Sequence, residues 1–289
     1  MQPLPQYAVD RIVRQALDED APWGDLTSQT LIPAQARVKA SLVAREHGIL
    51  AGIQLFTAAM HLTDPEIHVQ AQHDGQPFFP GDVLATAEGP ARAILQAERI
   101  ALNFVQRLSG IATLTAQFVE QTKGTKARVV DTRKTTPTLR LFERYAVRCG
   151  GGGNHRYSLS DAVLVKDNHL AVLAANSSQT LTEALREARA NLPHTAHLEV
   201  EVDHPDQIEP VLAAGVDTIL LDNFTPDQLR AAVQQINGRA LVEASGNVRL
   251  DTVRAIAETG VDLISAGALT HSVRSLDLGL DILPEHSSQ

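Results

Sequence analysis

Six short segments rich in β-branched residues, in the second half of the chain, each end on or beside a residue that can bind a ligand or take part in catalysis. Amphipathic stretches separate these segments, and this alternation is typical of parallel strands joined by right-handed helical crossovers. In a (β/α) barrel the carboxyl ends of the strands meet at one open face, where catalytic residues lie. One polar strand end can mean only that a strand reaches solvent, but six together favour a functional face. The segments end near Asp131, Lys166, Glu201, Asp222, Ser245 and Ala266.

Two glutamates, Glu199 and Glu201, stand two positions apart in one of these segments and therefore share one face of a strand. If the other face packs on helices, both carboxylates point into the barrel, where Lys166 could lie across the interior. A buried carboxylate needs a cation, a metal or hydrogen-bond donors, because leaving it unpaired is costly. The residues alone leave open a structural ion-pair network and an acidic patch that binds a metal–phosphate substrate or sugar hydroxyls.

The segment 133–166 reverses the charge of the chain. It contains seven lysines and arginines against two acidic residues, whereas the whole chain has a formal net charge of −9. A local reversal of this size predicts a small-anion site rather than a nucleic-acid track. Arg140, Arg144 and Arg148 are spaced four residues apart, which predicts that they lie on one solvated face of a helix. The other members, together with one histidine, fall in predicted loops or at strand ends, where functional side chains are frequent: Arg133, Lys134, His155, Arg156 and Lys166.

Small residues offer backbone N–H groups at two of the strand ends. Barrels often bind phosphate at the last strand ends, near helix N-termini, and these ends carry Ser245, Gly246 and Asn247, then Ala266, Gly267 and Ala268. Four consecutive glycines, Gly150–Gly153, are expected to let the backbone fold sharply and deliver the following Asn-His-Arg to a ligand. The chain lacks a phosphate-loop motif, HExxH, a zinc-binding cysteine pair and a GxSxG elbow.

The composition predicts a globular cytoplasmic protein. Of the 289 residues 44% are apolar and 20% are charged, which is the ordinary range for a folded domain. The negative net charge disfavours nucleic acid and anionic membranes as partners. The single cysteine, Cys149, cannot form an internal disulfide, which fits a reducing compartment. We expect neither a signal peptide nor a membrane-spanning segment.

Hydrophobic periodicity divides the chain into an N-terminal α+β domain, 1–110, and an α/β-barrel catalytic domain, 111–270. We expect a helix over 7–20, an antiparallel β layer over 36–90, and a long helical stretch over 91–122 with a break at Gly110. Six β/α units follow, so the expected fold class is α/β, with an incomplete (β/α) barrel. An open doubly wound sheet is the alternative, because strand order cannot be read from the sequence. The C-terminal tail, 271–289, is a candidate to pack back on the first domain.

Nine motifs, in order and over almost the whole chain, resemble those of the quinolinate phosphoribosyltransferase family. The resemblance implies an enzyme that transfers the phosphoribosyl group of phosphoribosyl pyrophosphate to quinolinate with decarboxylation, yielding nicotinate mononucleotide, pyrophosphate and CO2 for NAD biosynthesis. It also implies Mg²⁺ bound with phosphoribosyl pyrophosphate, no organic cofactor, and a homodimer. The motifs are GDLTS (24–28), ERIALNFVQRLSGIAT (98–113), DTRKTTPTLR (131–140), YAVRCGGGGNHR (145–156), SDAVLVKDNH (160–169), EVEVD (199–203), ILLDNF (219–224), EASGN (243–247) and ETGVDLISAGALTHSV (258–273).

The resemblance also implies roles for individual residues. Arg133, His155 and Arg156 would hold the two quinolinate carboxylates, with Thr132 also at the substrate. Lys134 and Lys166 would neutralise carboxylate and phosphate charge. Glu201 and Asp222 would face the ribose and the magnesium–pyrophosphate, as candidate Mg²⁺ ligands, with Glu199 a weaker candidate. The expected catalytic residues are Lys134, Lys166, Glu201 and Asp222. Residues 245–247 and 266–268 would cradle the 5′-phosphate, and Arg99 would enter the site of the partner subunit.

The chain departs from the family pattern at two loops. Thr138 stands where the family usually has glycine, and Tyr157-Ser158 replace an apolar residue and glycine. Three other interpretations remain open at this point: a barrel aldolase with Lys166 as a Schiff-base lysine, a related protein without enzymatic activity encoded with molybdate-transport genes, and a sister transferase acting on another base. The basic residues around TRK and NHR favour the transferase acting on a polyanion.

Overall fold

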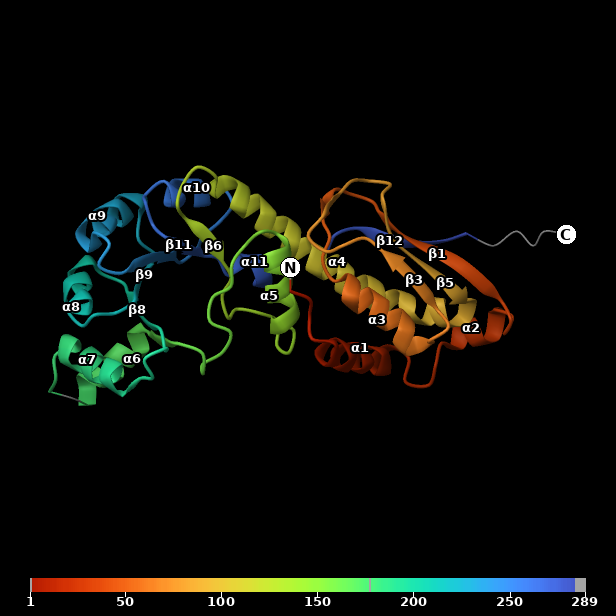
Figure 1. Cartoon of the computed structure of the whole chain (residues 1–289), viewed down its shortest axis with the longest axis horizontal. Coiled ribbons are helices and arrows are strands. Elements are labelled where there is room, and N and C mark those ends of the chain that lie inside the picture. The colour runs from red at the N-terminus through yellow and green to blue at the C-terminus, as the bar shows by residue number, and fades with distance from the viewer. Residues whose placement is uncertain (1, 177, 284–289) are drawn as a thin grey trace. The chain divides into compact units, whose positions relative to one another are not determined.

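The computed structural model describes residues 2–176 and 178–283, which form two compact units (Figure 1). The first unit comprises the chain up to Ala116, the segment Thr138–Gly151 and the C-terminal segment from Val273. The second comprises Gln117–Pro137 and Gly152–Ser272. No helix among the described residues combines the length and the apolar character needed to cross a bilayer.

The first unit contains a four-stranded antiparallel sheet, which confirms the β layer expected over 36–90. Its strand order is β12 (Leu278–Leu283), β1 (Arg37–Ala44), β5 (Val83–Pro90) and β3 (His68–Ala71). Every second side chain of β1 from Ala40 onward is buried, because alternate residues of a strand face opposite sides of the sheet. The remaining elements are two short paired strands, β2 (Gly48–Ile49) and β4 (Pro77–Phe78), and the helices α1 (Gln6–Asp20), α2 (Leu26–Leu31) and α3 (Ile53–Thr63).

Helix α4 (Ala91–Thr122) runs without interruption through Gly110, so the expected break there is wrong. A Cβ at Gly110 would lie 2.2 Å from the carbonyl oxygen of Arg274. Glycine is therefore required at this position because another segment of backbone approaches the helix closely, and not because the helix ends. The next helix of this unit, α5 (Arg140–Cys149), carries Arg140, Arg144 and Arg148, all half-buried rather than on a solvated face.

The second unit contains six parallel strands, and their order identifies an incomplete barrel. The order is β6 (Arg128–Val130), β11 (Leu263–Ser265), β10 (Leu241–Ser245), β9 (Thr218–Asp222), β8 (Leu198–Val202) and β7 (Val163–Val165). Strands consecutive in the chain are neighbours from β7 to β11, and β6 pairs with β11. A doubly wound sheet would reverse its order at a switch point. This sheet instead follows a barrel that is open between β6 and β7, where Gly153 forms a parallel bridge with Val130.

Helices follow these strands in the chain, and α8, α9 and α10 lie along the outer side of the sheet (Figure 1). Two of them begin with a capping box, in which the first side chain and the one three residues later satisfy each other's backbone N–H groups. The six strands end within one residue of the positions expected from the sequence. The helices are α6 (Asp167–Asn176), α7 (Leu181–Asn191), α8 (Ile208–Leu212), α9 (Pro226–Ile236), α10 (Val253–Ala257) and α11 (Ala268–His271), with a 3-10 turn at Pro205–Gln207.

Thr138 adopts a left-handed backbone conformation with φ of 71°, which explains why glycine suits this position. A β-branched residue is strained there by about 1–2 kcal/mol. We expect Thr138→Gly to raise the free energy of unfolding by about 1 kcal/mol, after the greater flexibility of glycine in the unfolded chain offsets part of the gain. Urea denaturation would measure the change. Thr138→Ala keeps the Cβ and should gain less. An unchanged or lower stability of the glycine variant would contradict the assignment of strain.

Candidate active site

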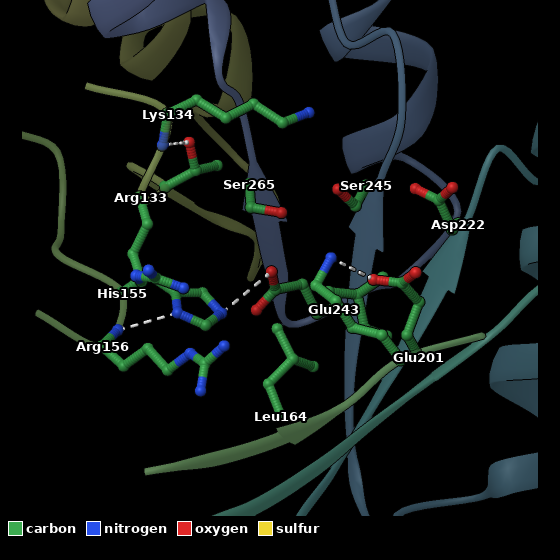
Figure 2. A pocket seen from close by; sticks show the side chains of 13 residues that line it. Arg133, Lys134, His155, Arg156, Leu164, Glu201, Asp222, Glu243, Ser245 and Ser265 are labelled. Carbon is green, nitrogen blue, oxygen red and sulfur yellow. Dashed lines mark hydrogen bonds and ion pairs between the residues drawn. The ribbon is translucent and has the colours of Figure 1, made fainter. Parts of the chain in front are cut away.

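A cavity of about 380 Å³ lies at the carboxyl ends of the strands in the second unit (Figure 2). Nine residues predicted from the sequence line it: Thr132, Arg133, Lys134, His155, Arg156, Lys166, Glu201, Asp222 and Ser245. The other four lining residues, absent from that set, are Leu164, Leu220, Glu243 and Ser265.

Strand periodicity could have found three of these four. Leu220 and Glu243 each precede a predicted site residue by two positions on the same strand, and Leu164 of β7 stands two positions before Lys166, which directly follows that strand, so the same period of two applies. Ser265 ends β11 and has no comparable signal. The inward face of each strand is therefore a better guide to the cavity than its last residue alone.

Of the two segments predicted to cradle phosphate, 245–247 and 266–268, only Ser245 lines the cavity, and the other residues adjoin it. Gly246 and Asn247 follow Ser245 directly, and residues 266–268 follow Ser265. A Cβ at Gly267 would lie 3.0 Å from the side chain of Lys134, so this segment packs against a lining residue. Arg99 lies on an exposed face of α4 in the first unit and is also outside the lining set.

Two guanidinium groups form the cationic side of the cavity. The side chain of Arg156 donates from Nη1 to the carbonyl oxygen of Ala162 at 2.9 Å, which holds it over the start of β7. Burial, and then the positive charge of Arg133, lower the pKa of Arg156 from its usual value. The guanidinium remains protonated, because an arginine is not deprotonated in a protein. Two partly desolvated cations that repel each other favour an anionic ligand between them.

Asp131 anchors the loop that carries Asn154, His155 and Arg156. Its side chain is fully buried at the end of β6 and accepts hydrogen bonds from Asn154 Nδ2 at 2.6 Å and from the backbone N–H of His155 at 2.8 Å. Gly153, which immediately precedes this loop, donates its backbone N–H to the carbonyl oxygen of Val129 and accepts the backbone N–H of Asp131. The glycine run therefore brings the chain back against β6, and of the three residues that follow it His155 and Arg156 line the cavity, whereas Asn154 bonds to Asp131.

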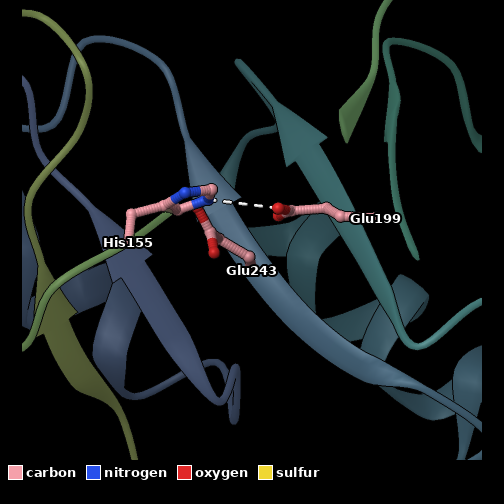
Figure 3. Close-up of side chains that lie close together, drawn as sticks. All are labelled: His155, Glu199 and Glu243. Atoms are coloured by element: carbon pink, nitrogen blue, oxygen red, sulfur yellow. Dashed lines mark ion pairs between the residues drawn. The ribbon is translucent and has the colours of Figure 1, made fainter. Parts of the chain in front are cut away.

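The imidazole of His155 lies between this loop and two buried glutamates. Its Nδ1 accepts the backbone N–H of Arg156 at 2.8 Å. Its Nε2 lies 3.1 Å from Oε2 of Glu199 and 3.5 Å from Oε1 of Glu243 (Figure 3). Burial, and then the negative charge of Glu199, raise the pKa of Glu243 to about 7. Both ring nitrogens of His155 thus have partners within the protein.

Carboxylates gather on the other side of the cavity, around the ends of β8 and β9 (Figure 2). Lys166 Nζ donates to Oε2 of Glu201 at 2.9 Å, so the lysine does lie across the interior from that glutamate. Carboxylate oxygens of Glu201, Asp203 and Asp222 all lie within 4.8 Å of one another. Burial, and then the charge of Asp203, raise the pKa of Asp222, while Lys166 and Lys134 act in the opposite direction. This side can accept a cation.

Two tight turns after β9 and β10 pack against each other beside the carboxylates. Asn223, Gly246 and Asn247 all have positive φ, and Asn247 Nδ2 donates to Oδ1 of Asn223 at 3.1 Å. A Cβ at Gly246 would lie 2.7 Å from the backbone nitrogen of Asn223, so no larger residue fits without displacing that turn. The close approach explains why a glycine stands here; the phosphate-binding role of residues 245–247 stays a prediction.

Comparison with known proteins places the chain in a family. Models of the N-terminal and C-terminal domains of quinolinate phosphoribosyl transferase match residues 25–109 and 111–281. A probable nicotinate-nucleotide pyrophosphorylase (carboxylating) of Bacillus subtilis is 41% identical over 271 residues, covering 93% of this chain and 92% of that protein. The Mycobacterium leprae nicotinate-nucleotide pyrophosphorylase (carboxylating) is 44% identical over 280 residues, covering 93% and 95%. The crystal structure of NadC from Streptococcus pyogenes superposes with a TM-score of 0.91 at 41% identity, over 98% of this chain and 100% of that one. The chain therefore belongs to the quinolinate phosphoribosyltransferase family.

Proposed function

We propose that the protein is the decarboxylating quinolinate phosphoribosyltransferase of NAD biosynthesis. It transfers the phosphoribosyl group of phosphoribosyl pyrophosphate to quinolinate, yielding nicotinate mononucleotide, pyrophosphate and CO2. The observation that carries the proposal is a single cavity with cationic side chains on one side and carboxylates on the other (Figure 2). The cationic side suits a pyridine dicarboxylate, and the acidic side suits a sugar that becomes cationic as it reacts.

The cationic side overcomes the repulsion between two polyanionic substrates. Arg133 and Arg156 pair with the carboxylates of quinolinate, and Lys134 neutralises charge between the two substrates. Charge-assisted hydrogen bonds of this kind contribute about 1.5–3 kcal/mol each. Arg156 reaches the cavity already held by the carbonyl oxygen of Ala162, so little side-chain freedom is lost on binding.

The acidic side stabilises the transition state of phosphoribosyl transfer. The quinolinate nitrogen forms a bond to C1 of the ribose as the bond from C1 to the pyrophosphate oxygen breaks, and positive charge develops on the sugar. Glu201 and Asp222 face that charge, and Lys166 holds Glu201 in place. The product nitrogen is then a pyridinium. Its positive charge stabilises the electron pair that stays on the adjacent ring carbon when the carboxylate there leaves as CO2, and a proton then bonds to that carbon. No organic cofactor is needed for this step.

Mg²⁺ is the expected companion of phosphoribosyl pyrophosphate. Glu201, Asp203 and Asp222 offer carboxylate oxygens within 4.8 Å of one another, and Mg²⁺ prefers oxygen ligands shared between one or two carboxylates and substrate phosphates. The donor set therefore fits the ion. When bound, Mg²⁺ neutralises charge on the leaving pyrophosphate.

We also propose a homodimer with shared sites, and two features of the first unit support it. Arg99 is exposed and, within residues 2–176 and 178–283, forms no hydrogen bond or ion pair. Trp23, Leu26 and Leu31 expose large apolar side chains on the same unit, a feature typical of interaction surfaces. Both observations support a surface that meets a second copy of the chain.

Subunit mixing tests the shared site. Arg99→Ala and Lys166→Ala should each abolish most activity alone. A symmetric dimer built from one subunit of each kind has one intact site, so an equal mixture should recover about one quarter of wild-type activity after subunit exchange. A mixture of Arg99→Ala with wild-type protein should keep about one half of wild-type activity whether or not subunits exchange, so it controls for activity lost during mixing. No recovery in a mixture shown to contain heterodimers would contradict the shared site.

We also place the protein in the cytoplasm. Its single cysteine is buried, and burial raises the pKa of the Cys149 thiol to about 12, so the thiol is a packing residue rather than half of a disulfide. Cell fractionation followed by immunodetection would check this, and recovery with exported proteins would contradict it.

One assay tests the reaction itself. The protein is incubated with quinolinate, phosphoribosyl pyrophosphate and Mg²⁺ while CO2 and the mononucleotide are measured. We expect equal amounts of both products. Turnover of nicotinate without turnover of quinolinate would move the assignment to a sister transferase, and a borohydride-stable adduct at Lys166 with a carbonyl compound would indicate an aldolase.

A further inference from the structure

We infer that Asp161 is a positioning residue for quinolinate binding: its carboxylate closes the turn between Arg156 and Ala162 and thereby fixes where the Arg156 guanidinium lies in the cavity. The hydroxyl of Ser158 belongs to the same turn. The inference deepens the proposed function and rests on it for the identity of the ligand. It assigns a role to a carboxylate that does not itself line the cavity.

The turn, residues 157–161, joins the two ends of a hydrogen-bonded ring. Arg156 donates from Nη1 to the carbonyl oxygen of Ala162 at 2.9 Å, so the position of the guanidinium follows that carbonyl. The carbonyl belongs to the residue just before β7, which is fixed in the sheet by its pairing with β8. The conformation of the turn therefore sets the distance that the arginine side chain must span to reach its acceptor.

Hydrogen bonds rather than apolar packing hold this turn. Tyr157, Leu159, Ser160 and Asp161 are exposed, and Ser158 is half-buried. On Oδ2 the carboxylate of Asp161 accepts the backbone N–H groups of Tyr157 at 2.6 Å and of Ser158 at 3.1 Å. On Oδ1 it accepts the hydroxyl of Ser158 at 2.8 Å. A single side chain at the end of the turn thus collects three donors from its first two residues, in the way that aspartates commonly order a loop.

Ser158 adds a further connection, at a position where the family usually has glycine. Its hydroxyl donates to Asp161 and accepts the backbone N–H of Ser160 at 3.1 Å, so it bridges the beginning and the end of the turn. Glycine offers no hydroxyl for these two hydrogen bonds. In this chain the serine therefore reinforces the turn that Asp161 closes.

The charge of Asp161 and its hydrogen bonds affect ligand binding in opposite directions. Burial, and then the charge of Arg133, lower the pKa of Arg156, whereas acidic neighbours that include Asp161 act in the opposite direction. A negative charge near this guanidinium also repels a dicarboxylate, so removing the charge alone should strengthen quinolinate binding. Removing the hydrogen bonds should weaken binding, because the guanidinium must then be ordered when the ligand binds. The sign of the change in affinity therefore separates the two effects.

Two substitutions of Asp161 test the positioning role. Asp161→Ala removes the charge and the acceptors, and should raise the Kd and KM for quinolinate by about fivefold to tenfold. The kcat and the KM for phosphoribosyl pyrophosphate should change by less than about twofold. Asp161→Asn removes the charge but keeps an oxygen that can accept the N–H groups of the turn, and should bind quinolinate at least as tightly as wild type. Equal losses in the two variants, or no loss in Asp161→Ala, would overturn the role.

Glu183 provides a matched control for Asp161→Ala. Its carboxylate also accepts a backbone N–H, at 2.9 Å, and a hydroxyl, at 2.8 Å, both from Thr180. Like Asp161, it is exposed in the second unit and does not line the cavity. Glu183→Ala should leave both KM values unchanged. A loss of quinolinate affinity equal to that of Asp161→Ala would overturn the inference, because any exposed carboxylate would then have the same effect.

A double-mutant cycle tests the part that Ser158 plays. Ser158→Ala alone should raise the Kd for quinolinate by about twofold to fivefold. Added to Asp161→Ala it should cause little further loss, because both substitutions open the same turn. Fully additive losses would show that Ser158 acts elsewhere and would overturn its part in the inference.

A spectroscopic measurement tests the positioning of Arg156 without activity or ligand. In nitrogen NMR of protein labelled at its arginines, the Arg156 side-chain signal is identified by its loss in Arg156→Lys. We expect a guanidinium of restricted motion in wild type and in Asp161→Asn, and a more mobile one in Asp161→Ala. Equal order in all three proteins would overturn the inference. If wild-type protein fails to bind or turn over quinolinate, the proposed function fails, whereas the mobility of Arg156 still decides whether Asp161 positions it.

Discussion

Replacing Arg156 with alanine is expected to raise the Kd and KM for quinolinate by about 100-fold or more, because removing one partner of a desolvated ion pair costs about 3–5 kcal/mol. Arg156 is the cationic group whose position the structure defines most completely. Its guanidinium is bonded to Ala162, its amide is bonded to His155, and its pKa is lowered by burial and by Arg133. The KM for phosphoribosyl pyrophosphate should change little, because the acidic residues lie on the other side of the cavity.

Arg186 provides a matched control for this substitution. It also donates to a backbone carbonyl, that of Ala213, but it is exposed and does not line the cavity. Arg186→Ala should leave both KM values unchanged. Arg156→Lys keeps the charge but loses the planar fork, and should fall between alanine and wild type. Steady-state kinetics and calorimetric titration with quinolinate provide the measurements. Wild-type affinity in Arg156→Ala would remove the carboxylate-binding role.

The largest expected effect on stability is at Arg107. This residue of α4 donates from Nε at 3.0 Å and from Nη2 at 2.6 Å to Oε1 of Glu143, a fully buried residue of α5. Arg107→Ala removes this guanidinium while the carboxylate of Glu143 stays buried. We therefore expect the free energy of unfolding to fall by about 3–5 kcal/mol. Urea denaturation of the first unit's transition would measure it.

An exposed pair gives the contrast for Arg107. Arg249 contacts Asp251 at 3.0 Å, but both side chains are well exposed, and solvent screens such pairs so that they contribute little to stability. Arg249→Ala should therefore leave the urea midpoint unchanged. If Arg107→Ala and Arg249→Ala lowered the free energy of unfolding by comparable amounts, burial of Glu143 would not be the cause of the effect at Arg107.

The sequence predicted the strand ends well because parallel strands buried on both faces have a strong composition signal and stop at polar residues. Asp222 and Ser245 end β9 and β10 as expected, and Lys166 follows β7 directly. The period of two along a strand also predicted that Glu201 points into the interior that Lys166 reaches, where the two side chains form a hydrogen bond. Both signals are local, which is why a single sequence carries them.

Contacts between distant segments could not be predicted in the same way. Gly110 has the local signature of a helix break. Glycine is required there, however, because of a contact 164 positions further along the chain, at the carbonyl of Arg274. Asp131 and Glu243 look like an ordinary strand end and an ordinary inward residue. Their importance depends on which loop returns to them, and only the folded backbone shows that Asn154 and His155 do so.

The gap in the ring of strands has a consequence for ligand capture. The edge of β6 beside this gap forms a seam with Gly153, which donates to Val129 at 2.8 Å and whose carbonyl oxygen accepts from Asp131 at 3.2 Å. Gly153, which forms this pairing, is followed directly in the chain by the loop that carries Asn154 and Arg156. Local opening of this pairing should therefore also move the guanidinium of Arg156. We expect a ligand bound in the cavity to slow amide exchange at Gly153 and Asp131 more than in strands far from the gap.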